Sequence, residues 1–386
     1  MIKKNLCKIC NSEITAIPLC NAPIAGIKCN SIEESIKHPI FKHTFNHCSM
    51  CNMVSYHYFD EASSLLDKMY ASQPSTYSLL SGASDYIKNF CKSLISKYNI
   101  QKDDNILEIG CNDGELLHEI KSQSKCNVLG IEPSSSFTTI WKDRKLNIIN
   151  TFFSDETVTE LANQQFKIIT FRHVFEHIKE PQDFFANVAK LAQDETIIVI
   201  EVPYLKTIID NERYENTSYS HLNYFSIRPL TVLAKQYGFH IIHQETAVTD
   251  GGSLVVHLSR QNKQNNSFDD NITAEQLTTF VSNLDTKKEK IHALIKKYSK
   301  NEIVAYGAGA KGPHLMYLFD LNNYLSYIVD DNTSFAGQYI AGTDVQVQPT
   351  SFLQNKNIKA VINFAPTHSK LIKSKVPQSL KFIDLI

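Results

Sequence analysis

Apolar and polar residues alternate in blocks through the middle of the chain. Stretches with helical spacing separate six apolar runs rich in β-branched residues: NILEIG, NVLGIE, FKIITF, ETIIVIEV, FHIIHQ and SLVVHL. In 84–98 the helical face collects Tyr86, Ile87, Phe90, Leu94 and Ile95. Strands that alternate with helices are typical of a doubly wound α/β sheet. The pattern therefore predicts an α/β core.

The patterning also divides the chain. At 386 residues it is too long for one compact core. A polar stretch at 260–271 reads as a linker, and 272–298 reads as a long helix. We expect four parts: a metal-binding module at 1–66, the α/β core at 67–260, a linker and connecting helix at 261–300, and a second Rossmann-like domain at 301–386.

Charge and hydropathy exclude several classes of protein. The 39 basic residues balance 40 acidic ones, so no basic patch indicates nucleic acid as a partner. No apolar stretch approaches the length needed to span a bilayer, and the N-terminus lacks the apolar region of a signal peptide. We therefore expect a cytoplasmic protein that acts on a small molecule, with its oligomeric state left open.

Two cysteine pairs occur in the first 51 residues, Cys7 with Cys10 and Cys48 with Cys51. In a reducing compartment such pairs favour metal ligation over disulfides, and two C-x-x-C turns complete a tetrahedral zinc site. Four protein ligands leave no open position, so the metal is expected to be structural. A redox role is the main alternative. Possible substitutes for one ligand are Cys20, Cys29, His43 and His47.

A glycine turn follows the first apolar run of the core. The segment GCNDGELL places Gly110 and Gly114 between a buried strand and a helix, where nucleotides and phosphates are usually held. The next strand ends in Glu132, eighteen residues beyond Gly114. A carboxylate at that position suits the two vicinal hydroxyls of a ribose.

These features, with FRHVFEHI at the fourth strand, resemble the class I S-adenosylmethionine methyltransferases. The resemblance implies that the loop approaches the methionine part of the cofactor and that Glu132 binds its ribose. Asn112 stands where the family usually has its middle glycine. The cofactor-binding residues implied in this way are Glu108, Gly110, Asn112, Asp113, Gly114, Glu132, Pro133 and His173.

Further motifs resemble the sugar C-methyltransferases that act on nucleotide-linked 4-keto-deoxysugars. CKIC, LCNAPIAG and HCSMCNMVSY are similar to that family's N-terminal zinc module. GCNDGELL, IEPS, HLNYFS and DGGSL are similar to its methyltransferase core, and VAYGAGAKG with YIVDDNTSFAGQYIAGTDVQV to its C-terminal module. The resemblance covers nearly the whole chain and implies S-adenosylmethionine and zinc as cofactors.

The resemblance also implies a mechanism in which a base removes a proton beside a ketone, so that the enolate carbon attacks the methyl group. His221 falls on the last histidine of the family's His-Glu-His-Leu segment, while Tyr219 and Ser220 replace the first two residues. The base is kept and its acidic partner is lost. The expected catalytic residues are His221, Tyr77, Tyr219 and His177. The alternative is O-methyl transfer, which needs only one base, or only proximity, at a hydroxyl group.

A second glycine turn, GAGAKG at 307–312, follows another strand. Taken alone, this turn matches the pattern of a dinucleotide-binding site, with Gly307, Gly309 and Gly312 as its glycines. An NAD-dependent oxidoreductase is therefore an alternative. Lys311 favours a diphosphate ligand instead, and the resemblance associates this turn with the sugar nucleotide. The substrate-binding residues expected on this basis are Gly307, Gly309, Lys311 and Tyr224.

Overall fold

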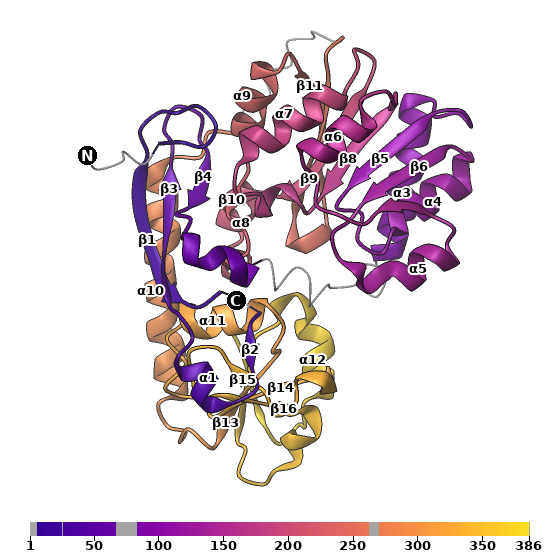
Figure 1. The fold of residues 1–386 in the computed structure, drawn as a ribbon. Coiled ribbons are helices and arrows are strands. Elements are labelled where there is room, and N and C mark those ends of the chain that lie inside the picture. The colour runs from indigo at the N-terminus through magenta and orange to yellow at the C-terminus, as the bar shows by residue number, and fades with distance from the viewer. Residues whose placement is uncertain (1–5, 25, 67–82, 262–269, 386) are drawn as a thin grey trace.

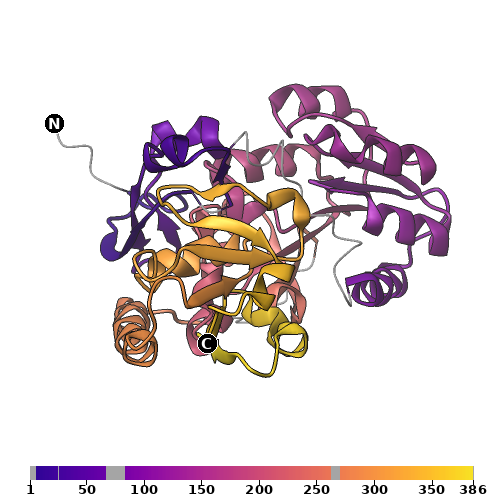
Figure 2. The ribbon, with the colours of Figure 1, turned by 90° about the horizontal axis from the view of Figure 1, so that it is seen from below.

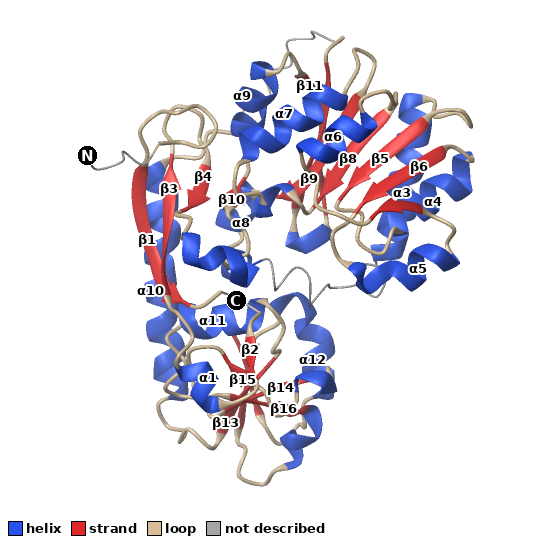
Figure 3. Ribbon diagram, viewed as in Figure 1, coloured by secondary structure: helices blue, strands red, loops and turns tan. Residues whose placement is uncertain are grey.

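The computed structural model describes residues 6–24, 26–66, 83–261 and 270–385. Within these ranges the strands form three sheets (Figures 1 and 3). No helix of this described part is long and apolar enough to cross a membrane. The single-turn helices are η1 Asp60–Ala62, η3 Ser135–Phe137, η4 Phe175–His177, η5 Tyr214–Asn216, η6 Thr249–Gly251, η7 Thr333–Phe335, η8 Thr350–Gln354 and η9 Pro366–His368.

The first sheet is small and antiparallel, in the order β1-β3-β4-β10. Its strands are β1 Thr15–Ala22, β3 Phe41–His47, β4 Val54–Tyr56 and β10 Asn223–Tyr224, and helix α1 spans Ile32–Ile36. The last strand comes from the core, some 170 residues beyond β4. The N-terminal region is therefore completed by a segment that lies between α8 Leu205–Asp210 and α9 Ile227–Gln236 in sequence.

The central sheet has the order β11-β12-β9-β8-β5-β6-β7. Its strands are β5 Asn105–Ile109, β6 Asn127–Ile131, β7 Asn147–Ile149, β8 Ile168–Arg172, β9 Ile197–Pro203, β11 His240–Ala247 and β12 Ser253–Ser259. All neighbours from β7 to β9 are parallel, whereas β12 is antiparallel to β9 and β11. The order reverses at β5, and such a switch point is where α/β sheets bind ligands.

Helices cover both faces of this sheet (Figure 3). They are α3 Ala83–Tyr98, α4 Glu115–Ser124, α5 Thr138–Asp143, α6 Asp155–Leu161, α7 Pro181–Leu191, α8 Leu205–Asp210 and α9 Ile227–Gln236. On β5, Leu107 and Ile109 pack in the cluster with α6, α7 and α9, whereas Ile106 packs in the cluster with α3 and α4. Successive strand residues face opposite sides, so a strand covered on both faces is apolar along most of its length. The predicted doubly wound α/β core is confirmed.

The third sheet has the order β18-β17-β13-β14-β16-β15-β2. Its strands are β13 Ile303–Tyr306, β14 Tyr327–Asp330, β15 Tyr339–Ile340, β16 Gln346–Pro349, β17 Ala360–Asn363, β18 Lys381–Asp384 and β2 Lys28–Cys29. Its helices are α11 Lys311–Leu318 and α12 Ser369–Lys375. The edge strand β2 comes from the N-terminal region and pairs with β15 (Figure 1).

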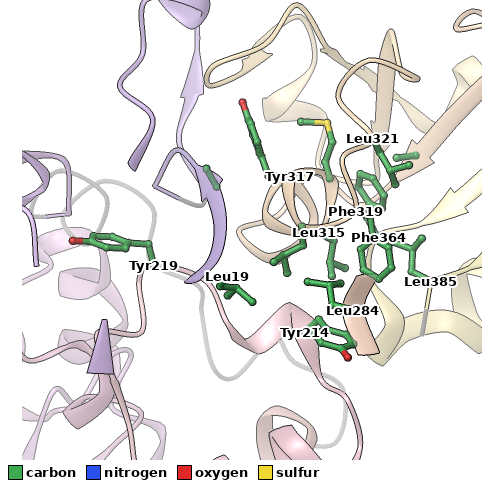
Figure 4. Packing of buried hydrophobic residues seen from close by; sticks show 14 of the residues in the cluster. Leu19, Tyr214, Tyr219, Leu284, Leu315, Tyr317, Phe319, Leu321, Phe364 and Leu385 are labelled. Carbon is green, nitrogen blue, oxygen red and sulfur yellow. The ribbon is translucent and has the colours of Figure 1, made fainter. Parts of the chain in front are cut away.

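A long helix, α10 Ala274–Ile295, leads into this domain. Thr273 and Gln276 form a capping box at its start, because each side chain accepts the backbone N–H of the other residue. One apolar cluster joins α10 and α11 to β1 and to the third sheet. Figure 4 shows Leu19 of β1 close to Leu315 of α11, and Figure 2 shows the N-terminal segment beside the C-terminal sheet. The boundaries expected at 66, 260 and 300 stay predictions.

Candidate active site and metal centre

The turn after β5 has a backbone that requires glycine. Gly110 has a φ of 70°, Asn112 of 52° and Gly114 of 75°. The N–H of Gly110 donates to the Ile131 carbonyl at 2.7 Å. A Cβ on Gly110 would lie 2.3 Å from Cγ2 of Val174, in the loop after β8. The two loops are therefore in contact at the carboxyl edge of the sheet.

Glu132 holds this turn in place. Its Oε2 accepts the N–H of Asn112 at 2.9 Å, and its Oε1 accepts the N–H of Ser134 at 2.9 Å. Burial raises the pKa of this carboxyl, whereas the two N–H donors oppose that shift. Each carboxylate oxygen has two acceptor positions. The pair of backbone contacts therefore orients Glu132 and leaves acceptor capacity for two hydroxyl groups. Pro133 follows, half-buried.

Glu108 is a buried carboxyl at the same edge, 4% exposed. Its Oε2 makes no hydrogen bond with any described residue. Burial raises its pKa to about 8, although the charge of Arg172 acts in the opposite direction. A buried polar atom without a partner is costly, and a polar group of a bound cofactor would satisfy it. The residues present thus fit a nucleoside cofactor with a charged amino-acid tail.

The neighbouring strand ends, β8 and β9, carry a buried ion pair that the sequence analysis did not single out. Nε of Arg172 lies 2.6 Å from Oε2 of Glu201. The guanidinium also lies over the ring of Phe90, 5.3 Å from its centroid. Despite complete burial, the pKa of Glu201 is held far below its ordinary value, mainly by the positive charge of Arg172. The pair fixes the ends of β8 and β9 relative to α3.

His173 follows directly, with a left-handed φ of 52°. This backbone turns the ring toward two carboxyls, with Nε2 3.3 Å from Glu201 Oε1 and Nδ1 3.5 Å from Glu176 Oε1. Burial alone would raise the pKa of Glu176, but the nearby histidines His173, His177 and His221 more than offset it. The pKa of Glu176 is therefore lowered, so its carboxylate is the anionic centre of this loop.

His177 and His221 meet beside that carboxylate. Their ring centroids are 5.0 Å apart, and Nδ1 of His177 lies 2.6 Å from the Ser220 carbonyl oxygen. Ligand atoms of Glu176, His177 and His221 all lie within 4.8 Å of one another. His221 is 8% exposed. The arrangement can take up a proton at a histidine and stabilise the resulting cation with a buried carboxylate.

Tyr219 and Tyr224, in the segment 217–226, form hydrogen bonds with backbone groups. The hydroxyl of Tyr219 accepts the N–H of Phe59 and donates to the His57 carbonyl, both at 2.9 Å. Tyr224 donates to the Ser218 carbonyl at 3.4 Å. Both rings pack into the aromatic cluster against the first sheet. In this structure they anchor the loop that carries His221. Tyr77 lies outside the described residues.

The second glycine turn contacts the core. The N–H of Ala308 donates to Oδ2 of Asp330 at 2.6 Å, and Gly307 has a φ of 113°. A Cβ on Gly309 would meet no atom within 4 Å. Nζ of Lys311 donates to Oδ1 of Asn216 at 2.7 Å, and Asn216 belongs to η5, ahead of His221. The turn thus joins the C-terminal domain to the loop of the candidate base.

Four cysteines form a compact cluster at the N-terminal end. The Sγ atoms of Cys7 and Cys51 are 3.4 Å apart, as are those of Cys10 and Cys48, and all four lie within 4.8 Å. Each C-x-x-C turn ends in an asparagine with a φ of 58° that donates its N–H to the carbonyl of the first cysteine. These two residues are Asn11 and Asn52. A hydrogen bond from the Cys51 thiol lowers the pKa of Cys7.

Comparison with known families bears on both domains. Residues 84–244 match the model described as a methyltransferase domain, and residues 248–382 match the C-methyltransferase C-terminal domain. The two ranges follow one another and take in most of the chain. The chain belongs to the C-methyltransferase family. The resemblance stated from the sequence motifs is thus confirmed at the level of the family.

Individual relatives are distant. The C-methyltransferase NovU of Streptomyces niveus is 22% identical over 254 residues, which are 65% of this chain and 59% of that protein. Magnesium protoporphyrin IX methyltransferase of Synechocystis PCC 6803, solved with bound SAM, overlaps 53% of this chain and 98% of its own at 12% identity, with a TM-score of 0.39. A SAM-dependent methyltransferase of Geobacter sulfurreducens, solved with S-adenosyl-L-homocysteine, overlaps 50% and 97% at 12% identity, with a TM-score of 0.37.

The structure brings most of the expected C-methyltransferase residues into two groups. Gly110, Asn112, Gly114 and Glu132 surround the turn after β5, and His177 and His221 lie beside the loop after β8. Asp113 is buried at the start of α4, where its Oδ1 accepts the N–H of Glu115 at 3.1 Å. Glu176, which is not among the expected site residues, completes the second group. Its position between two histidines in FRHVFEHI was the available signal.

Proposed function

We propose that this chain is an S-adenosylmethionine-dependent methyltransferase that acts on carbon beside the keto group of a nucleotide-activated deoxysugar, with His221 as the base. The family supports methyl transfer. The observation that carries the finer proposal is the cluster of Glu176, His177 and His221, in which Glu176 and His177 belong to the loop that contacts the glycine turn through Val174. It supplies a base and an acid partner where the loops after β5 and β8 meet.

The cofactor side rests on the turn after β5. When bound, S-adenosylmethionine supplies an electrophilic methyl group. Glu132 would accept hydrogen bonds from the ribose hydroxyls, since both of its oxygens are held by backbone N–H groups. Glu108 would face the amino group of the methionine part, because its buried Oε2 makes no hydrogen bond with described residues. The glycines of the turn allow close approach of the backbone.

The proton transfer is assigned to His221. Its imidazole would accept the proton from the carbon next to the ketone, and the Glu176 carboxylate would stabilise the cation formed. Glu176 would thereby replace the acidic residue that Ser220 displaces from the family motif. His177 would position the loop, because its Nδ1 lies 2.6 Å from the Ser220 carbonyl and is set to donate to it.

The nucleotide-sugar side is proposed for the C-terminal domain. Gly309 is open at the turn, and Gly307 gives that turn its left-handed backbone. Lys311 adds a cation at the start of α11, where a diphosphate would gain from charge and from backbone N–H groups. Tyr77, ahead of the core, stays a predicted substrate contact.

The cysteine cluster is proposed to bind structural zinc, in a cytoplasm that keeps thiols reduced. Zn–S bonds of about 2.3 Å in a tetrahedron place sulfur atoms about 3.8 Å apart. Two of the sulfur pairs here are 3.4 Å apart, and none exceeds 4.8 Å. Four thiolates would close the coordination shell, so the ion would hold the fold and leave no position for substrate.

Deuterium exchange tests the carbon chemistry. Nucleotide-linked 4-keto-deoxysugars are incubated in D₂O with protein and S-adenosyl-L-homocysteine, and mass spectrometry follows exchange of the α-proton. We expect exchange in the wild type and a loss of about 10²–10⁴-fold in His221→Ala, the usual contribution of a general base. His240→Ala, on the outer strand β11, is the matched control.

Glu176→Gln tests the partner carboxylate. The acidic limb of the pH–rate profile of Glu176→Gln should move to lower pH, because the protonated imidazole of His221 loses its anionic neighbour. Methyl transfer from labelled donor without α-proton exchange would favour O-methylation instead. Unchanged turnover in His221→Ala would refute its role as base.

A further inference from the structure

A second group of metal-binding side chains lies where the N-terminal sheet meets the C-terminal domain. Ligand atoms of Cys20 on β1, His43 on β3 and His314 on α11 all lie within 4.8 Å of one another. Cys20 and His43 are direct cross-strand partners in the β1–β3 register. The three side chains come from three elements, one of them nearly 300 residues away in sequence. No atom of the four-cysteine cluster is shared with this group.

The hydrogen bonds around His314 fix its tautomer. Oγ1 of Thr217 donates its one proton to the Tyr214 carbonyl at 2.7 Å. It must therefore accept at its 2.9 Å contact with Nε2 of His314, which carries the ring proton. Nδ1 then bears a lone pair, is buried, and makes no hydrogen bond with a described residue. Metal-binding histidines typically donate their other N–H to such a partner.

His43 is the most enclosed member, with no exposed surface. Neither ring nitrogen makes a hydrogen bond with described residues, and the Ala22 carbonyl lies near without the required geometry. Its ring is surrounded by those of Tyr219 at 5.1 Å, Tyr56 at 5.4 Å and His314 at 5.9 Å. A buried imidazole with two unsatisfied nitrogens normally has an unseen partner.

We propose that Cys20, His43 and His314 bind a second metal ion, Zn²⁺ or Cu⁺. One thiolate with two imidazoles suits these borderline and soft ions, whereas Mg²⁺ and Ca²⁺ prefer oxygen ligands. Cys20 is half-buried and is the least enclosed of the three ligands. The ion ties β1 and β3 to α11. Through Thr217 it also steadies the segment that ends in His221.

Metal content tests the site. Reduced wild-type protein, purified without chelator and equilibrated with Zn²⁺ or with Cu⁺ in separate samples, should hold two ions per chain by mass spectrometric metal analysis. Cys20→Ser and His43→Phe should each hold one. Cys7→Ser with Cys48→Ser should keep the ion of the second site. Cys29→Ser, a buried thiol outside both clusters, should keep two. One ion in the wild type under both metals overturns the proposal.

Alkylation of the wild type provides a readout that needs no variant to fold. Native protein is treated with iodoacetamide after incubation with Zn²⁺, Cu⁺ or a chelator, and the Cys20 peptide is quantified by mass spectrometry. We expect strong protection of Cys20 by one of the two ions, which also identifies the metal. Equal modification of Cys20 in all three samples would overturn the proposal, whatever the total metal content.

Discussion

The buried carboxyl of Glu108 should make the stability of this protein fall as pH rises. Burial holds its pKa at about 8 in the fold, against an ordinary value of 4.5. Below pH 4.5 the group is protonated in both the folded and the unfolded chain. Between these two values the unfolded chain releases the proton and the folded chain keeps it, so rising pH favours unfolding. Above pH 8 the loss is complete.

The size of this effect follows from the same two values. One pKa unit corresponds to about 1.36 kcal/mol, so the gap sets a ceiling of about 5 kcal/mol on the stability lost. Glu108→Gln keeps the shape of the side chain and removes the titration. The free energy of unfolding of Glu108→Gln, relative to wild type, should therefore rise by a few kcal/mol between pH 4.5 and 8.5.

Urea unfolding of both proteins, followed at several pH values across this range, measures the difference. Glu195→Gln is the matched control, since it removes an exposed carboxyl just before β9. Its difference from wild type should stay nearly constant with pH. A Glu108→Gln difference that is equally flat would refute the reasoning, because it would mean that the folded chain carries Glu108 ionised at neutral pH.

Two other predictions concern the metal centre and the glycine turn. Cys7→Ser with Cys48→Ser should remove one zinc ion and destabilise the fold, because a structural zinc site contributes folding free energy directly. Zinc analysis and thermal unfolding measure these two effects. An unchanged metal content would contradict the prediction. Gly110→Ala should abolish binding of S-adenosyl-L-homocysteine, because the added Cβ would lie 2.3 Å from Val174 at a residue with a φ of 70°. Calorimetry measures the affinity, and Gly337→Ala is the control, since Gly337 has a left-handed φ and open space around it. Retained affinity in Gly110→Ala would contradict the prediction.

Local chemistry made part of the structure predictable. The C-x-x-C pairs predicted the cysteine cluster because neighbouring residues alone are enough for each turn to direct two thiols to one point. The apolar runs predicted the central sheet because strands buried on both faces are apolar along most of their length. The capped helix α10 followed from its own polar and apolar spacing.

Contacts between distant segments were beyond such reasoning. Glu176 and His221 are 45 residues apart and meet only because η4 and the loop before β10 fold together. Asn223 joins these two segments by donating to the Ile178 carbonyl at 2.6 Å. The family motif has its acidic residue at the position of Ser220 in this chain. The structure brings a carboxylate from another loop instead.

The strand β2 was missed for a related reason. Two residues carry no periodic pattern, so Lys28 and Cys29 gave no signal of a strand. Their partner β15 is also two residues long and lies more than 300 residues later. Pairing of this kind depends on the assembled sheet.

The position of β2 has a consequence for synthesis of the chain. At about 5–20 residues per second, β15 leaves the ribosome some tens of seconds after β2. During that interval Lys28 and Cys29 have no sheet edge to join, while β1 can already pair with β3 and the central sheet can close. The β2 segment is thus among the last parts of the chain to reach its final place. A ribosome that stalls before residue 339 therefore holds a chain with a finished central sheet and an unpaired β2.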